Sequence, residues 1–144
     1  MTNDKFHFPQ LFLRLAISLT ILSAVADRFG FWGENSVWGN WENFEKYTKQ
    51  LAFFLPESLG TFSAFAATFF EILFPLMLIF GFKTKIAAFG TGVLLMVFGL
   101  SMTIALGIKA PFDYSVWVGS AAAFLLAIQE KFSLSFDELL RKDN

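Results

Sequence analysis

The sequence predicts an all-α integral membrane protein, a four-helix bundle with an additional amphipathic interfacial helix in the first outer loop. Hydrophobic residues make up 56% of the 144 positions, charged residues only 16%, and 21 positions are Phe, a composition far from that of soluble proteins. The apolar residues gather into four runs, and none of the runs alternates with period two. Helices rather than barrel strands would therefore satisfy the backbone in lipid. We treat the chain as a single membrane domain.

The first predicted span covers residues 9–29. A cleaved signal peptide would end in a small-x-small site, whereas this run ends in Asp27-Arg28-Phe29-Gly30. We therefore expect the span to be retained. The other predicted spans cover residues 59–82, 86–108 and 113–129, and residues 130–144 form a cytoplasmic tail.

Small residues recur along one side of three of these spans and predict helix-packing faces. Such faces would pack the bundle and could also join copies of the chain in a homo-oligomer. The three sets are Ala16, Thr20, Ser23, Ala24 and Asp27 on the first span, Ala88, Gly92, Gly99, Thr103 and Gly107 on the third, and Ser115, Gly119, Ala123 and Ala127 on the fourth.

The connection between the first and second spans contains an amphipathic pattern over residues 40–55. Asn40 is a suitable N-cap, Glu45 and Lys49 lie four positions apart with the acid first, and Pro56 marks the stop. This segment predicts a helix at the headgroup level, either an outer gate or an interfacial anchor. One side of the helix would carry Trp41, Phe44, Thr48, Leu51 and Leu55, and the other Glu42, Lys46, Lys49 and Gln50.

The basic residues favour an orientation with both termini in the cytoplasm. With four spans, one side of the membrane carries Lys5, Arg14, Lys83, Lys85, Lys131, Arg141 and Lys142, and the other side Arg28, Lys46, Lys49 and Lys109.

Glu71 is the single charged residue of the 59–82 span and would lie near the bilayer midplane. Placing an acidic side chain there costs about 2.5 to 3.5 kcal/mol on an insertion scale. At 100° per residue, Thr68, Glu71 and Pro75 share one face, which we expect to point into the bundle. Pro75 has no N–H, so the Glu71 carbonyl loses its helical partner. The Glu71 carboxylate and this unpaired carbonyl together indicate either a ligand, proton or ion site or a buried structural pair.

Two residues of the first span are candidates to act with Glu71. Arg14 is the predicted partner, because its long side chain could reach Glu71 from the cytoplasmic side, although it could instead extend to the headgroups. Asp27 lies on the small-residue face and would either point inward beneath the amphipathic helix or belong to a polar helix end at the interface. The candidate ligand-binding residues are therefore Glu71, Arg14, Asp27 and Thr68.

The residue types limit the chemistry. The chain has no Cys and one His, which argues against iron–sulfur, thiol and internal metal centres. We find no autonomous redox or nucleophilic centre, so no catalytic residue is assigned and whether the chain is an enzyme stays open. The net charge of −1 and the scattered basic residues also argue against nucleic-acid binding.

Several segments together resemble the DoxX family of small membrane proteins: Leu13-Arg14-Leu15, Ala26 to Gly30, Glu71 to Leu76, Gly81 to Ala88, and Phe132 to Asp137. The resemblance implies a four-helix protein of the bacterial inner membrane, often a quinone-associated subunit beside an oxidoreductase partner. We therefore expect a quinone- or lipid-interacting subunit of a membrane oxidoreductase system. The alternatives are a small proton or solute transporter and a structural or assembly protein.

Overall fold

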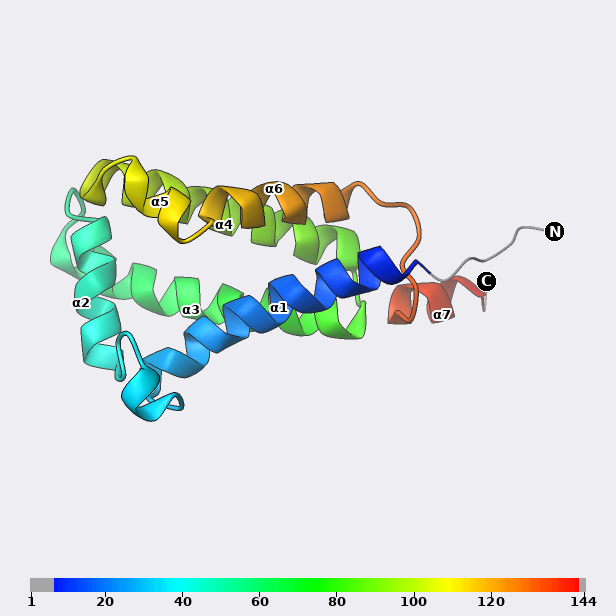
Figure 1. Cartoon of the computed structure of the whole chain (residues 1–144), viewed down its shortest axis with the longest axis horizontal. Helices are drawn as coiled ribbons and strands as arrows, with labels where there is room; N and C mark the ends of the chain where they lie inside the picture. Colours follow the sequence, from blue (N-terminus) through cyan, green and yellow to red (C-terminus); the bar gives the residue numbers. More distant parts are fainter. Residues whose placement is uncertain (1–6, 143–144) are drawn as a thin grey trace.

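A computed structural model describes residues 7–142 of the chain, and within these residues the fold is entirely helical. Figure 1 shows an elongated bundle with one helix lying across one end and both termini at the other. The helices are α1 (Phe8–Arg28), α2 (Trp41–Leu51), α3 (Glu57–Phe80), α4 (Thr84–Leu106), α5 (Lys109–Asp113), α6 (Val116–Ala127) and α7 (Phe136–Lys142), with a 3-10 turn at Gly33–Asn35.

Three of these helices are long and apolar enough to cross a membrane. The most apolar windows of α1, α3 and α4 have mean hydropathies of 1.6, 2.0 and 2.0. Most of their large apolar side chains face outward, where lipid rather than water is the compatible solvent. The protein is therefore a multi-pass membrane protein.

The fourth predicted span, residues 113–129, is corrected by the structure. The chain is divided there into α5 and α6, with Ser115 between them at a φ of +54°. At about 1.5 Å per residue α6 extends roughly 18 Å, less than the bilayer core of about 30 Å. Asp113, the first residue of the predicted span, ends α5 and pairs with Lys109. The fourth segment thus packs along α4 as a shorter helix.

The predicted packing face of α1 is also wrong, except at Asp27. Thr20 is exposed, and the buried residues of α1 are Arg14, Ile17, Ser18, Ile21, Val25, Asp27 and Arg28. Branched apolar side chains at this interface bury more apolar surface than the Ala, Ser and Thr stripe would. The helix is thus turned about its axis relative to the predicted orientation, and both of its arginines lie on its inner face.

Small residues of α4 and α6 pack these two helices against each other within the chain. α4 and α6 form the most extensive helix pair of the bundle. Gly92 lies against the Phe124 ring, Gly99 lies against Trp117, and the Ser120 hydroxyl donates to the Gly92 carbonyl at 2.8 Å. These stripes allow aromatic side chains to approach the helix backbone closely.

Gly92→Val should lower the free energy of unfolding by about 1 to 3 kcal/mol, because overpacking displaces neighbouring groups. A Cβ at this position would lie 2.8 Å from the Phe124 ring. The measurement is titration with SDS of the protein in mild-detergent micelles. Gly92→Val combined with Phe124→Ala should cost less than the sum of the two single changes. Simple additivity would mean that the ring does not limit the space at Gly92.

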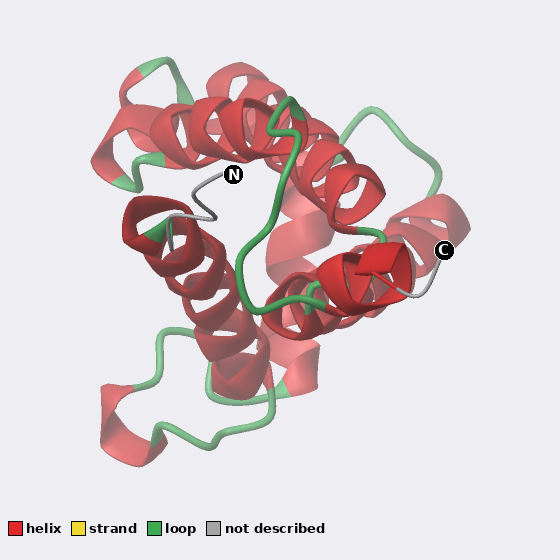
Figure 2. Ribbon diagram, turned by 90° about the vertical axis from the view of Figure 1, so that its right-hand side faces the viewer, coloured by secondary structure: helices red, strands yellow, loops and turns green. Residues whose placement is uncertain are grey.

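The two ends of the bundle are closed differently. α2 crosses one end, here called the capped end, and Asn40 begins it by accepting the Asn43 N–H at 2.9 Å. A helix thus lies within residues 40–55 and ends at Leu51, while its position at the headgroup level stays a prediction. At the other end, the termini end, the segment between α6 and α7 crosses the bundle (Figure 2).

Candidate functional site

Glu71 forms a buried ion pair with Arg28 at the capped end. Arg28 Nη2 lies 2.8 Å from Glu71 Oε1, and Nη1 lies 2.5 Å from Oε2. Nη1 also donates to the Thr68 hydroxyl at 2.7 Å. The side chains of Arg28 and Glu71 are only 2% and 6% exposed. The face predicted for α3 is thus confirmed, and Thr68 and Glu71 lie on it together.

Aromatic side chains cover this pair. The guanidinium carbon of Arg28 lies 3.7 Å from the centroid of the Phe44 ring and 5.6 Å from that of Trp38. Phe44 belongs to α2 and is itself buried. A cation over a ring face is attracted to it, more strongly when water is excluded. Arg28 therefore joins the end of α1, the middle of α3 and the inner side of α2.

Asp27 organises the loop that brings Trp38 to this cluster. Its carboxylate accepts the backbone N–H groups of Val37, Trp38 and Gly39 at 2.7, 2.8 and 3.3 Å. Three donors from one irregular segment satisfy a buried carboxylate well. Asp27 thus points inward beneath residues 37–39, as predicted, and it accepts hydrogen bonds from their backbone amides.

Polar contacts also attach α2 to α3. The Thr61 hydroxyl donates to Glu45 at 2.7 Å, and Lys49 lies 2.9 Å from the same carboxylate. The hydrogen bonds from Lys49 and from Thr61 hold the pKa of Glu45 below its ordinary value. Beside them, the rings of Trp41 and Phe65 stand 4.6 Å apart. The predicted Glu45–Lys49 pair is confirmed, and it faces α3.

Arg14 does not pair with Glu71, contrary to the predicted partnership. It lies at the termini end, 1% exposed, and its Nη atoms donate to the carbonyls of Ser133 and Leu134 at 3.1 and 2.8 Å. A longer contact of 3.4 Å reaches the carbonyl of Ile79 near the end of α3. Glu71 lies too far along α3 for this side chain. Arg14 instead binds the segment between α6 and α7 to the bundle.

Asp137 completes this second cluster. Its carboxylate accepts the N–H groups of Lys83 and Thr84 at 2.7 Å each, which satisfies the first turn of α4. Its own N–H donates to the Gly81 carbonyl at 2.9 Å. The tail segment Phe132 to Asp137 is therefore a structural part of the bundle end.

Among the four predicted ligand-binding residues, the structure brings together Thr68 and Glu71, places Asp27 at the same end and places Arg14 at the opposite end. Arg28 was missed. It lies fourteen positions after Arg14, two heptads along the helix, which puts both arginines on nearly the same face. This spacing was the sequence feature from which an inward-facing Arg28 could have been predicted. In residues 7–142, no group of three His, Cys, Asp or Glu side chains is placed to hold a metal ion.

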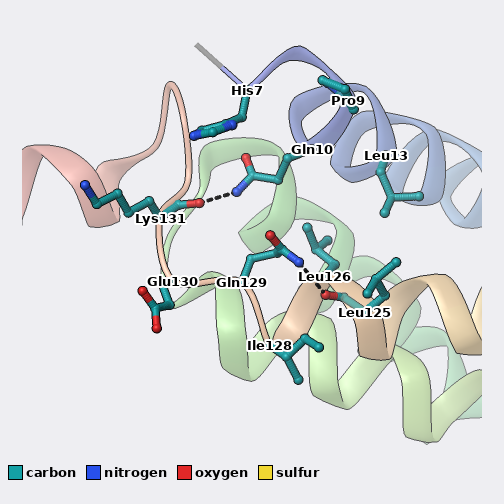
Figure 3. Close-up of a pocket in the computed structure, with 10 residues that line it drawn as sticks. All are labelled: His7, Pro9, Gln10, Leu13, Leu125, Leu126, Ile128, Gln129, Glu130 and Lys131. Carbon is teal, nitrogen blue, oxygen red and sulfur yellow. Dashed lines mark hydrogen bonds between the residues drawn. The ribbon is translucent and has the colours of Figure 1, made fainter. Parts of the chain in front are cut away.

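A cavity of about 560 Å³ lies at the termini end, where the start of α1 and the end of α6 meet (Figure 3). Its volume is typical of sites for small molecules. α1 packs mainly on α3 and touches α6 less extensively, which leaves room at this seam. Apolar side chains of Pro9, Leu13, Leu125, Leu126 and Ile128 line it together with His7, Gln10, Gln129, Glu130 and Lys131.

The three long apolar helices and the polar clusters at both bundle ends define a helical multi-pass membrane protein. The DoxX family model matches residues 9–104, from α1 to α4. The chain belongs to the DoxX family. No curated protein and no solved structure matches it.

Proposed function

We propose that the protein is a membrane subunit that binds a quinone or a similar lipophilic ligand between its helices, while an oxidoreductase partner supplies the redox centre. Its place would be the bacterial inner membrane, with both termini in the cytoplasm. The basic residues around the termini end, such as Lys83, Lys85 and Lys131, support this orientation.

The cavity at the seam of α1 and α6 carries the proposal. Leu13 and Leu126 provide an apolar wall, and Gln10 and Gln129 provide polar groups. An amphipathic ligand needs both kinds of surface, an apolar one for its tail and polar groups to orient its head. The outward-facing apolar side chains of the spans would keep the seam within reach of lipid.

A bound quinone would carry electrons to or from the partner, and this chain would bind and orient it. The buried arginines are not assigned to the ligand, since Arg28 is bound to Glu71 and Arg14 to backbone carbonyls. A ligand-binding role for Glu71, Arg14, Asp27 and Thr68 stays a prediction. A transport path through Asp27 and Glu71 would require both carboxylates to leave their partners, and we favour ligand binding for this reason.

The test is photolabelling of the protein in lipid nanodiscs with an azido-quinone, followed by mapping of the labelled peptides. Saturable label should fall on residues 7–13 and 125–131. Leu125→Trp, which adds bulk at the cavity on a side chain that is already exposed, should reduce the label about tenfold. Leu100→Trp, on an outward-facing position of α4, is the matched control and should leave it unchanged.

Two other results would revise the proposal. Label around Thr68 and Glu71 would move the ligand to the capped end, where the sequence predicted it. Label that does not saturate and spreads over all outward-facing helix surfaces would show partition into lipid and contradict a ligand-binding subunit.

A further inference from the structure

The orientation of the two amide side chains in the cavity is fixed by their hydrogen bonds. An amide side chain carries a donor end and an acceptor end, and which end faces a ligand depends on what the other end binds. In the cavity, the two amides are those of Gln10 on α1 and Gln129 just after α6. Each donates one N–H of its amide nitrogen to a backbone carbonyl.

Gln10 donates through Nε2 to the carbonyl of Lys131. A carbonyl can only accept, so the amide nitrogen must lie on that side and the orientation of the group is fixed. Its Oε1 is buried and has no hydrogen-bond partner. Such an orphaned acceptor is costly, because it has lost water without gaining a donor.

Gln129 is oriented in the same way. Its Nε2 donates to the Leu125 carbonyl at 3.2 Å, one turn back along the chain. Figure 3 shows its oxygen on the side toward Gln10, with the two amides lying between α1 and the end of α6. The cavity therefore presents the buried amide oxygen of Gln10 as an acceptor, and the exposed Gln129 adds a second amide oxygen.

The neighbouring charged groups do not change which hydrogen-bonding groups the amides offer to a ligand. The ammonium group of Lys131 and the carboxylate of Glu130 extend away from the two amides (Figure 3). His7 also lines the cavity, and its imidazole can donate or accept, so it favours neither kind of head group.

We propose that this cavity takes a lipophilic ligand whose head group donates hydrogen bonds, and that it binds a hydroxyl-bearing quinol in preference to the oxidised quinone. The inference rests on the proposed function. A quinol has two O–H donors, whereas the two carbonyls of a quinone only accept. The reduced head group can donate a hydrogen bond to Gln10 Oε1, which has no partner, whereas the oxidised head group leaves this buried oxygen without a donor.

The test is competition for azido-quinone labelling by a short-chain quinone, added either oxidised or reduced and kept anaerobic. Because the chain contains no Cys, a reductant changes the ligand and leaves the protein's covalent structure unchanged. The quinol should compete at about tenfold lower concentration, the factor expected for one hydrogen bond made or missing.

Gln129→Leu should reduce this preference severalfold. The variant should fold normally, since Gln129 is exposed and its bond is local. Gln10→Leu should reduce the preference further. Gln50→Leu, an exposed position at the end of α2, is the control and should retain the full preference.

Equal competition by quinone and quinol would overturn the inference and leave the proposed function standing. A preference that survives both Gln129→Leu and Gln10→Leu would also overturn it, since the amides would not be its source. Failure of both forms to compete would instead contradict the proposed function.

Discussion

Arg28→Met should lower the free energy of unfolding by about 3 to 5 kcal/mol, because it leaves the Glu71 carboxylate buried without its cation. The change also removes the bond to Thr68 and the contact with the Phe44 ring. SDS titration in mild-detergent micelles, followed by tryptophan fluorescence, measures the loss. Trp38 stands beside Arg28 and should report the opening of the capped end.

Two further variants separate the buried charge from other effects. Lys109→Met breaks an ion pair whose side chains are 82% and 52% exposed, so it should cost no more than about 1 kcal/mol. Arg28→Met combined with Glu71→Met should recover part of the loss, since no unpaired charge remains. If Arg28→Met cost no more than Lys109→Met, the ion pair would not be what stabilises the capped end.

Gly81→Ala should be strongly destabilising, by about 3 kcal/mol or more, through two effects that act together. Gly81 ends α3 at a φ of +67°, which costs roughly 1 to 2 kcal/mol for an L-residue. Its Cβ would also lie 2.7 Å from the Cα of Ser135. The tail would have to move away from Arg14 and Asp137, and trypsin should then cleave faster after the exposed Lys131.

Gly33→Ala is the matched control for Gly81→Ala. Gly33 has a similar φ of +57°, but a Cβ there meets open space. The control should therefore show the backbone cost alone, without faster cleavage after Lys131. Equal losses for the two variants would mean that close packing of the tail on the end of α3 contributes nothing to stability.

The inner face of α3 could be predicted because one periodic run contains a single charge. Thr68, Glu71 and Pro75 share an arc, and an acidic side chain in a membrane protein avoids lipid. The amphipathic pattern of α2 was predictable for a similar reason, since its polar and apolar sides differ along a short segment. In both cases the sequence pattern and the burial arise from the same helical period.

The face of α1 was not predictable from small residues alone. Ile17, Ile21 and Val25 occupy the interface, and apolar residues of a membrane span face lipid as readily as protein. Its arginines were the better indicator of the inward face. The division between α5 and α6 was also hidden, because it depends on the backbone conformation at Ser115, and an apolar run gives no sign of such a turn.

The partners of the polar residues depend on tertiary structure. Asp27 and Arg14 bind backbone groups of irregular segments, at residues 37–39 and 133–134 respectively. Backbone amides and carbonyls are present at every position, so side-chain types do not reveal which of them lie nearby. Sequence reasoning could therefore identify polar groups that need a partner without identifying the partner.

The two arginines of α1 fix the phase and the length of this helix together. Arg14 and Arg28 are separated by about 21 Å along the axis, and each is bound at one end of the bundle. One inserted residue between them would turn one guanidinium by about 100° toward lipid, whereas seven inserted residues would turn it by only about 20°. Seven inserted residues would also separate the two arginines by roughly 10 Å more, so neither insertion should let both side chains reach their partners. α1 therefore sets the register against which the rest of the bundle is aligned.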